Sequence, residues 1–289
     1  MLKKMKKSLD KIAKLGYNNH KEVERDELLD LSFNPNASYR NHKSLFKLAE
    51  TINKARASLV DCPPIIIAGG YIRDTILGLN AKDFDLFFDV SAYPPDETED
   101  MVLLALAAIR DTENNMDRFA PPRKFTKNGE PYELKEDNEE EQIIIYEMHA
   151  NMLAGPIPVQ LMGHRDALAT TDPLKFVEKF DYGLVRALFN PETMKYSIHS
   201  SFFEELKTKN INFNGSRTKE RVFSFLYKLK RETGESFTMN GETRNSIRYA
   251  STTVPWFPQY EAQAIRNNVA FQNILQLDGN RAVRIIDDA

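Results

Sequence analysis

The sequence predicts an α+β protein in which strands alternate with helices over the first two thirds of the chain. Short apolar runs of strand length, such as 65–67 and 83–90, are separated by segments with apolar residues at helical spacing. The composition, with 42% hydrophobic and 28% charged residues, is that of an ordinary globular protein. The 289 residues are enough for one large domain or two smaller ones, each with its own core.

The periodicity of the apolar residues predicts the elements in order. A helix is predicted where they recur every three or four positions, and a strand where β-branched or aromatic residues cluster or alternate. After Asp181 the sequence is expected to be helical. The predicted helices are 43–59, 71–77, 98–111 and 217–231, and the predicted strands are 65–67, 83–90, 142–149 and 157–163, the last two forming a hairpin around Gly155-Pro156.

These elements suggest three regions: a polar N-terminal lead-in with one short helix (1–42), a head domain (43–195) and a mainly helical C-terminal domain (196–289). Within the head, residues 111–141 are charged and interrupted by Pro and Gly, so they are predicted to be a solvated, mobile insertion. The charge is uneven along the chain. Fourteen acidic and six basic residues occur from 95 to 141, whereas the later helix at 217–231 is strongly basic.

Charge, cysteine content and hydropathy exclude several classes of protein. A formal net charge of −3 excludes a wholly basic nucleic-acid binder but leaves room for a local basic face. The single cysteine, Cys62, excludes an internal disulfide framework and a Cys-cluster zinc site. The basic N-terminus lacks the apolar region of a secretory signal, and no stretch reaches the roughly 18 apolar residues of a membrane span. We therefore expect a cytoplasmic protein without membrane contact.

The first chemically informative feature is a pair of glycines. The short strand at 65–67 is followed by Gly69 and Gly70, and then by a predicted helix. Glycines at this place leave backbone N–H groups open to an approaching phosphate, and a helix N-terminus favours anions. Arg73, one turn into the helix, can add a bidentate contact to the phosphate. A Gly-Gly pair alone is usually no more than a turn, so the neighbouring residues decide whether it is interpreted as a phosphate-binding site.

The second feature is a pair of carboxylates on the next predicted strand. Asp83 and Asp85 lie two positions apart, so their side chains point to the same face. Two carboxylates held this close repel each other unless a hard cation lies between them, and Mg²⁺ prefers oxygen ligands combined with substrate phosphates. A phosphate-binding turn facing a carboxylate pair is the arrangement that two-metal nucleotidyl transfer requires.

The spacing of these residues resembles the head domain of the tRNA nucleotidyltransferase (CCA-adding) and bacterial poly(A) polymerase family, class II of the polymerase-β-like nucleotidyltransferases. That family's signature reads G-G-x-V-R-D-x-x-L-G-x-x-x-x-D-x-D, and the sequence follows it without a gap. The resemblance implies a polymerase-β-like nucleotidyltransferase head, a small mixed sheet with helices, followed by a short helical domain. The matching residues are Gly69, Gly70, Arg73, Asp74, Gly78, Asp83 and Asp85, with Ile72 and Leu77 as hydrophobic equivalents.

Weaker similarities follow in the family's order. The family strand V-E-x-x-x-x-R is similar to 159–165, and the motif R-R-D-F-T-I-N-A-x-x-Y-N-P is similar to 179–182 together with 189–192. The resemblance implies that Asp83 and Asp85 are catalytic and bind the metal ions. The residues that it implies for nucleotide binding are Gly69, Gly70, Arg73, Arg165, Asp181, Arg217 and Arg221.

The sequence also departs from the family's pattern. Gln160 stands where the family commonly has an acidic residue, and Glu147 on the partner strand is a candidate substitute. Lys179-Phe180 replaces the family's paired arginines before Asp181. Asp74 has two open interpretations, an active-site role or a salt bridge within its own helix.

The resemblance implies a Mg²⁺-dependent enzyme, with two metal ions, that moves a nucleotide from ATP or CTP to the 3′ end of a tRNA or another RNA and releases pyrophosphate. One alternative keeps this chemistry on a protein or small-molecule acceptor, because the chain is shorter than typical members, which have larger helical domains for gripping tRNA. The other alternative is a non-catalytic RNA- or nucleotide-binding module. Retention of both Asp83 and Asp85 argues against it.

Overall fold

The structure is a computed structural model, and the statements that follow concern the residues it describes. None of the helices in this part of the chain is long and apolar enough to span a bilayer. The described residues are 20–23, 28, 31–59, 62–94, 96–112, 123–124, 126–127, 130–131, 143–152, 155–164, 172–212, 219–235, 237–239, 275–277 and 283–285.

The chain divides into two compact units. The head unit comprises residues 1–179 and 185–200, and the second unit comprises residues 180–184 and 201–289. The chain therefore leaves the head unit for five residues, returns to it, and leaves it again. The short excursion at 180–184 contains Asp181.

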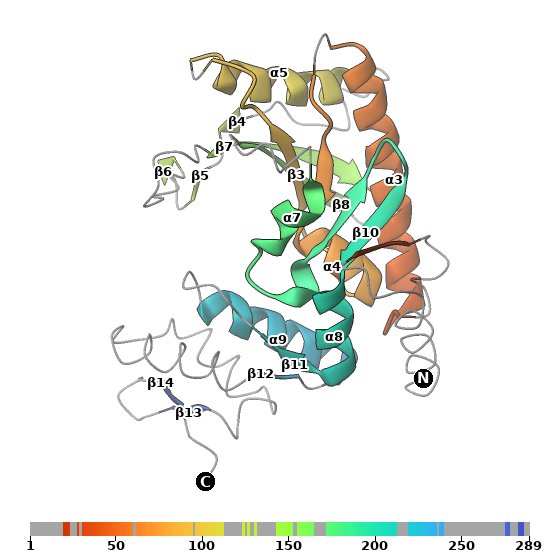
Figure 1. Ribbon diagram of the computed structural model, residues 1–289, viewed down its shortest axis with the longest axis vertical. Helices are drawn as coiled ribbons and strands as arrows, with labels where there is room; N and C mark the ends of the chain where they lie inside the picture. Colours follow the sequence, from red (N-terminus) through yellow and green to blue (C-terminus); the bar gives the residue numbers. More distant parts are fainter. Residues whose placement is uncertain are drawn as a thin grey trace. The chain divides into compact units, whose positions relative to one another are not determined.

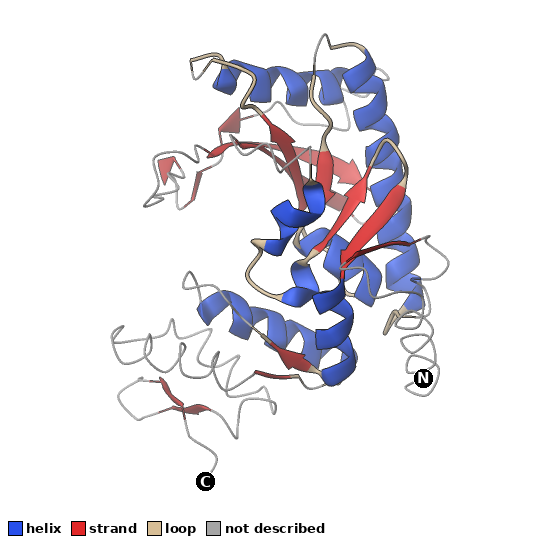
Figure 2. Cartoon of the chain, viewed as in Figure 1, coloured by secondary structure: helices blue, strands red, loops and turns tan. Residues whose placement is uncertain are grey.

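A mixed eight-stranded sheet forms the centre of the head unit, in the order β1-β10-β9-β2-β3-β8-β7-β4 (Figures 1 and 2). The pairing of β3 with β8 is parallel and the other neighbours are antiparallel, which confirms the predicted mixed sheet and the predicted hairpin of β7 and β8. The strands are β1 (His20–Val23), β2 (Ile66–Ala68), β3 (Phe84–Asp89), β4 (Arg123–Lys124), β7 (Ile143–Met152), β8 (Gly155–His164), β9 (Ala187–Asn190) and β10 (Lys195–His199).

Helices α3 (Pro35–Ala57), α4 (Gly70–Leu77) and α5 (Thr98–Asp111) belong to the head unit, and α3 contacts both of the others. Helix α5 has the predicted bounds. Helix α3 begins eight residues earlier than predicted, because Asn34 caps it by accepting a hydrogen bond from the Ala37 N–H at 3.3 Å and Pro35 suits the first helical turn. The polar sequence before residue 43 hides this start from an analysis of apolar periodicity.

Helices α3 and α4 meet at a shared corner. Gly78 ends α4 in the left-handed conformation, with φ 69°. A Cβ at Gly78 would collide with Ser32 Oγ and with the backbone of Asn34, which caps α3. Directly beside this contact, the Phe33 N–H donates to the Leu77 carbonyl at 2.9 Å. Only glycine suits this corner, because both the backbone conformation and the available space exclude a side chain.

The expectation that the chain after Asp181 is helical is wrong for residues 187–199, which form the hairpin of β9 and β10. The alternation in Lys195–His199 buries Tyr196 and Ile198 and is a period-two pattern. Sequence analysis missed it because both strands are short and the turn between them has no glycine. Strand β1 was also missed, and β4, within the predicted solvated insertion, pairs with β7 at the sheet edge.

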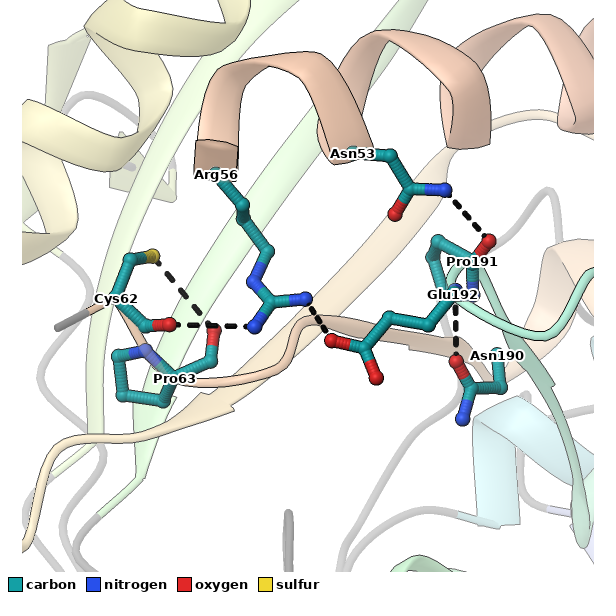
Figure 3. A network of polar contacts seen from close by, with 7 residues as sticks. All are labelled: Asn53, Arg56, Cys62, Pro63, Asn190, Pro191 and Glu192. Atoms are coloured by element: carbon teal, nitrogen blue, oxygen red, sulfur yellow. Dashed lines mark hydrogen bonds and ion pairs between the residues drawn. The ribbon is translucent and has the colours of Figure 1, made fainter. Parts of the chain in front are cut away.

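A polar network joins the end of α3 to the turn between β9 and β10 (Figure 3). Asn53 donates to the Pro191 carbonyl at 2.8 Å, and Arg56 forms an ion pair with Glu192. Arg56 also donates to the Cys62 carbonyl at 3.3 Å. These contacts attach the end of α3 to the β9–β10 turn and to the loop that leads into β2.

The described part of the second unit contains helices α8 (Ser200–Thr208) and α9 (Lys219–Thr233). Two short strands, β11 (Asn210–Ile211) and β12 (Thr238–Met239), pair in parallel, and Thr238 donates its backbone N–H to the Lys209 carbonyl at 2.7 Å. Helix α9 occupies most of the predicted helix at 217–231.

Candidate functional site

The predicted phosphate-binding turn lies at the start of α4. Gly69 is the N-cap residue, with φ 80° and ψ −146°, a conformation that only glycine adopts without strain. The helix begins at Gly70, and the Arg73 N–H donates to the Gly69 carbonyl at 3.2 Å. The strand–turn–helix arrangement that the sequence predicted is therefore present.

The carboxylate pair lies directly beside this turn. Asp83 precedes β3, and Asp85 is the second residue of that strand. Asp85 pairs across the sheet with Ala68, the residue before Gly69. A Cβ built on Gly69 would lie 2.7 Å from Asp85 Oδ2, so the missing side chain is what allows the carboxylate to approach the turn. Asp83 and Asp85 are both half-buried.

Arg73 and Asp74 form an ion pair within α4. Both the Nε and the Nη2 of Arg73 lie 2.8 Å from Asp74 Oδ1, and the two side chains are about nine-tenths or more buried. A Cβ on Gly70 would lie 3.7 Å from Arg73 Nη2, so the guanidinium lies beside the second glycine of the turn. The pair supports the salt-bridge interpretation of Asp74, and it fixes Arg73 close to the predicted phosphate position.

The position of a third carboxylate is occupied by an amide. In the parallel pairing of β3 with β8, Asp85 lies opposite Gln160, and Gln160 in turn lies opposite Glu147 on β7. Glu147 is thus two strand spacings from Asp85, about 10 Å between their backbones. The register places Gln160, and not Glu147, next to the carboxylate pair.

The donor set fits a divalent cation bound together with a substrate. Among the described residues, no group of three or more His, Cys, Asp or Glu side chains is arranged to hold a metal ion. Two carboxylates provide hard oxygen donors, and such pairs commonly bind Mg²⁺ with water and substrate phosphates completing its ligands. The missing side chain at Gly69 lets Asp85 Oδ2 lie against the turn, 2.7 Å from the position that a Cβ would occupy.

The structure does not bring every predicted site residue into this group. Asp181 belongs to the second unit. Arg165 and Arg217 lie outside the described residues. Arg221 is part of α9, but its side chain lies outside the described part. Their predicted roles in nucleotide binding stay predictions.

Sequence analysis missed one buried carboxylate. Glu205 on α8 is only 4% exposed and accepts two backbone hydrogen bonds, from Leu184 at 2.8 Å and from Asn212 at 2.9 Å. Its sequence neighbours resemble those of any amphipathic helix, and Glu204 beside it is exposed. Spacing alone could not separate these two glutamates.

Comparison with solved structures identifies the fold. A CCA-adding enzyme in complex with CTP aligns at 13% identity and TM-score 0.52, covering 87% of this chain and 52% of that one. A complex with ATP (14% identity) and an apo form (15% identity) each align with TM-score 0.50 and the same coverage. The chain therefore spans about half the length of these structures and shares the fold of the part of them that it matches. No curated protein sequence matches the chain.

The family is shown by a separate comparison. The sequence model of the Gabija anti-defense 2 (Gad2) family matches residues 39–209. The match covers more than half of the chain, and it includes the glycine turn, both aspartates of the carboxylate pair and Glu205. The chain belongs to the Gabija anti-defense 2 family.

Proposed function

We propose that this chain is a Mg²⁺-dependent nucleotidyltransferase that uses an NTP and releases pyrophosphate. The observation that carries the proposal is the approach of Asp85 to Gly69, which joins a carboxylate pair to a phosphate-binding turn within one unit. A cradle for phosphates beside hard oxygen donors favours phosphoryl chemistry over redox or acyl chemistry.

Each residue has a defined task in this reaction. The open backbone at Gly69 and Gly70 receives the triphosphate at the start of α4, and Arg73 adds positive charge beside it. Asp83 and Asp85 would hold two Mg²⁺ ions, which would supply activation of the attacking hydroxyl and neutralisation of the charge on the leaving pyrophosphate. The acceptor oxygen forms a new bond to the α-phosphorus, its proton passes to water, and the bond from the α-phosphorus to pyrophosphate breaks.

The acceptor that the sequence motif favours is the 3′-hydroxyl of an RNA, with ATP or CTP as the donor. The likeness to CCA-adding enzymes concerns the fold and does not extend to tRNA as the substrate. Membership of a family named for anti-defense against Gabija favours a second candidate acceptor, a component of the Gabija system itself. In both cases the carboxylate pair and the glycine turn perform the same step.

Incubation with each of the four α-³²P-labelled NTPs separates these acceptors. The reactions contain purified chain, Mg²⁺ and either total RNA, an extract of cells expressing Gabija, or a matched extract lacking Gabija. Label in RNA from all extracts supports the RNA acceptor, whereas label in a species found only with Gabija supports the second candidate. The matched control is the double variant Asp83→Ala with Asp85→Ala, which should transfer no label.

A binding module without catalysis gives a different result. It would bind NTP and release no pyrophosphate with any acceptor, and the double aspartate variant would behave like the unchanged chain. Pyrophosphate release that persists in the double variant would also contradict the proposed role of the two aspartates.

A further inference from the structure

Helix α3 concentrates positive charge on one face of the head unit. The helix contains five basic residues and one acidic residue, in a chain whose formal net charge is −3. Arg56, near its end, forms an ion pair with Glu192 in the network of Figure 3. The other four basic residues are exposed, and we call them the basic stripe: Arg40, Lys43, Lys47 and Lys54.

The members of the basic stripe lie in one line along the helix. Arg40, Lys43 and Lys47 are spaced three and four positions apart, which places their side chains on one helix face. Lys54 follows Lys47 by seven positions, or about two turns, and continues the line. At about 1.5 Å per residue the stripe is about 21 Å long. The opposite face is buried and supplies core residues such as Leu48, so the direction of the basic face is settled.

Three of the four cations have no acidic partner within the molecule. In the part of the chain that the structure describes, Arg40, Lys43 and Lys47 form no ion pair. Glu50 is the only acidic residue of α3, and it is exposed. Like charges held along one line repel one another. A polyanion bound along the line would remove this repulsion and would release its own counterions, which favours binding.

An aromatic ring lies at the start of the basic stripe. Tyr39 is 52% exposed and lies four positions before Lys43, so its side chain is on the same side of the helix. Proteins that bind single-stranded nucleic acids combine a track of cations for the phosphates with aromatic rings on which bases stack. A duplex keeps its bases stacked on one another, and an acidic protein surface has no bases. The combination of cations and ring therefore favours a single strand.

The basic stripe is attached to the segment that carries the carboxylate pair. Asn41, next to Arg40, donates its side-chain amide to the Leu79 carbonyl at 2.8 Å. Leu79 belongs to the loop between α4 and β3, and the same loop carries the exposed Lys82 directly before Asp83. All of these residues belong to the head unit. A strand bound along the stripe would thus lie beside the loop that leads to Asp83.

We propose that the basic stripe and Tyr39 form a binding surface for a single-stranded nucleic acid. The cations contact phosphates of the strand, and Tyr39 stacks on one of its bases. Neither contact reads the 2′-hydroxyl, so RNA and DNA strands of equal length should bind with affinities within about threefold of each other. The surface does not include the carboxylate pair, so strand binding does not depend on the proposed function.

The test measures the affinity of the full chain for a fluorescent strand of about 20 nucleotides over a range of salt concentrations. An oligouridine, an oligothymidine and a duplex of the same length are compared. Lys43→Gln with Lys47→Gln should reduce the slope of log K against log salt by about 1.4, because each phosphate contact on a single strand contributes about 0.7. The matched control is Lys175→Gln with Lys207→Gln, which removes the same charge at exposed positions outside α3 and should leave the slope unchanged.

Two further variants should act in opposite directions. Glu50→Gln removes the acidic residue of α3 and should strengthen strand binding about twofold at low salt. Tyr39→Leu removes the ring and should weaken strand binding about tenfold at every salt concentration, with the slope unchanged, because stacking carries no counterion release. Both positions are exposed, so neither variant should change the melting temperature.

Several results would overturn the proposal. They are an unchanged slope in the lysine pair, unchanged affinity in Tyr39→Leu, a duplex that binds as tightly as the single strand, and a large preference for RNA or DNA. Polyglutamate that displaces the strand as effectively as unlabelled oligonucleotide would also overturn it, because the stripe would then serve an acidic protein.

The aspartate variant separates this surface from the proposed function. Asp83→Ala with Asp85→Ala should bind the strand as the unchanged chain does, while it releases no pyrophosphate. If the chain binds the strand through the stripe but releases no pyrophosphate with any acceptor, only the proposed function is wrong. If pyrophosphate is released and the stripe variants bind the strand like the unchanged chain, only this surface is wrong.

Discussion

In two regions of the molecule, a carboxylate packs closely against a glycine. At Gly69 the missing side chain lets the Asp85 carboxylate approach to 2.7 Å from the Cβ position, and at Gly183 it lets Glu205 approach to the same distance. Asp85 is half-buried at the start of a strand, whereas Glu205 is 4% exposed and has a backbone donor on each oxygen. The glycine alone therefore does not identify a functional carboxylate. The two carboxylates differ in exposure, since Asp85 is half-buried and Glu205 is almost fully buried.

The largest expected effect is a loss of activity in the aspartate variant, compared with a loss of stability in a Glu205 variant. Asp83→Ala with Asp85→Ala should reduce pyrophosphate release to the level without enzyme while changing the melting temperature little, because both side chains are half-buried and repel each other. Glu205→Ala should instead lower the free energy of unfolding, by about 1–3 kcal/mol for each buried N–H left without a partner. Release assays and thermal melts of both variants check this. A large loss of stability in the aspartate double variant would assign those residues to the fold.

The next effect tests the glycine at the turn. Gly69→Ala should lose stability by about 1–3 kcal/mol from its backbone conformation alone, and the collision with Asp85 should displace the carboxylate and lower activity. Gly234→Ala is the matched control, because Gly234 also has a positive φ of 74° but has no atom within 4 Å of the added Cβ. It should cost about 1–2 kcal/mol and leave activity intact. Equal activity losses in the two variants would rule out the collision as the cause.

A smaller effect tests whether Gln160 lies next to the proposed metal site. Gln160→Glu places a third negative charge opposite Asp85 in the register. Without Mg²⁺ the like charges should lower stability by about 0.2–1 kcal/mol. With Mg²⁺ the variant should recover and show a larger rise in melting temperature than the unchanged chain. Melts with and without Mg²⁺ measure this, and Gln160→Leu, which adds no charge, serves as the control. A variant that responds to Mg²⁺ like the unchanged chain would place Gln160 outside the metal site.

The smallest effect concerns the network of Figure 3, which joins α3 to the turn between β9 and β10. Burial raises the pKa of the Cys62 thiol, and the nearby Arg56 lowers it in part. Arg56→Ala should therefore raise this pKa further and slow alkylation of Cys62 by iodoacetamide near pH 8, since the thiolate is the reacting form. Arg56→Lys keeps the charge and should react nearly as fast as the unchanged chain. Faster alkylation in Arg56→Ala would mean that exposure, and not charge, controls this cysteine. Pyrophosphate release should not change in either variant.

Much of the head unit could be predicted from the sequence because its signals are local. The apolar stripe of α5 and the alternation in β3 each depend on a single element, and the glycine turn and carboxylate pair occur in one short segment. The hairpin of β9 and β10 was missed because its strands are short and their burial depends on partners far away in the chain. Glu205 was missed for the same reason. Its donors, Leu184 and Asn212, are 21 and 7 residues away, and no periodicity records them.

The role of Gly78 at the corner between α3 and α4 affects how the nucleotidyltransferase signature should be used. Gly78 is one of the residues that match the nucleotidyltransferase pattern, yet its task is to let α4 end against the start of α3. Selection to keep the fold would preserve Gly78 in a relative that had lost both aspartates. Within one short pattern, some positions thus record ancestry and others record chemistry. Under the proposed function, a survey of Gad2 proteins that scores only Asp83 and Asp85 should therefore sort active members from inactive ones more sharply than a survey of the whole pattern.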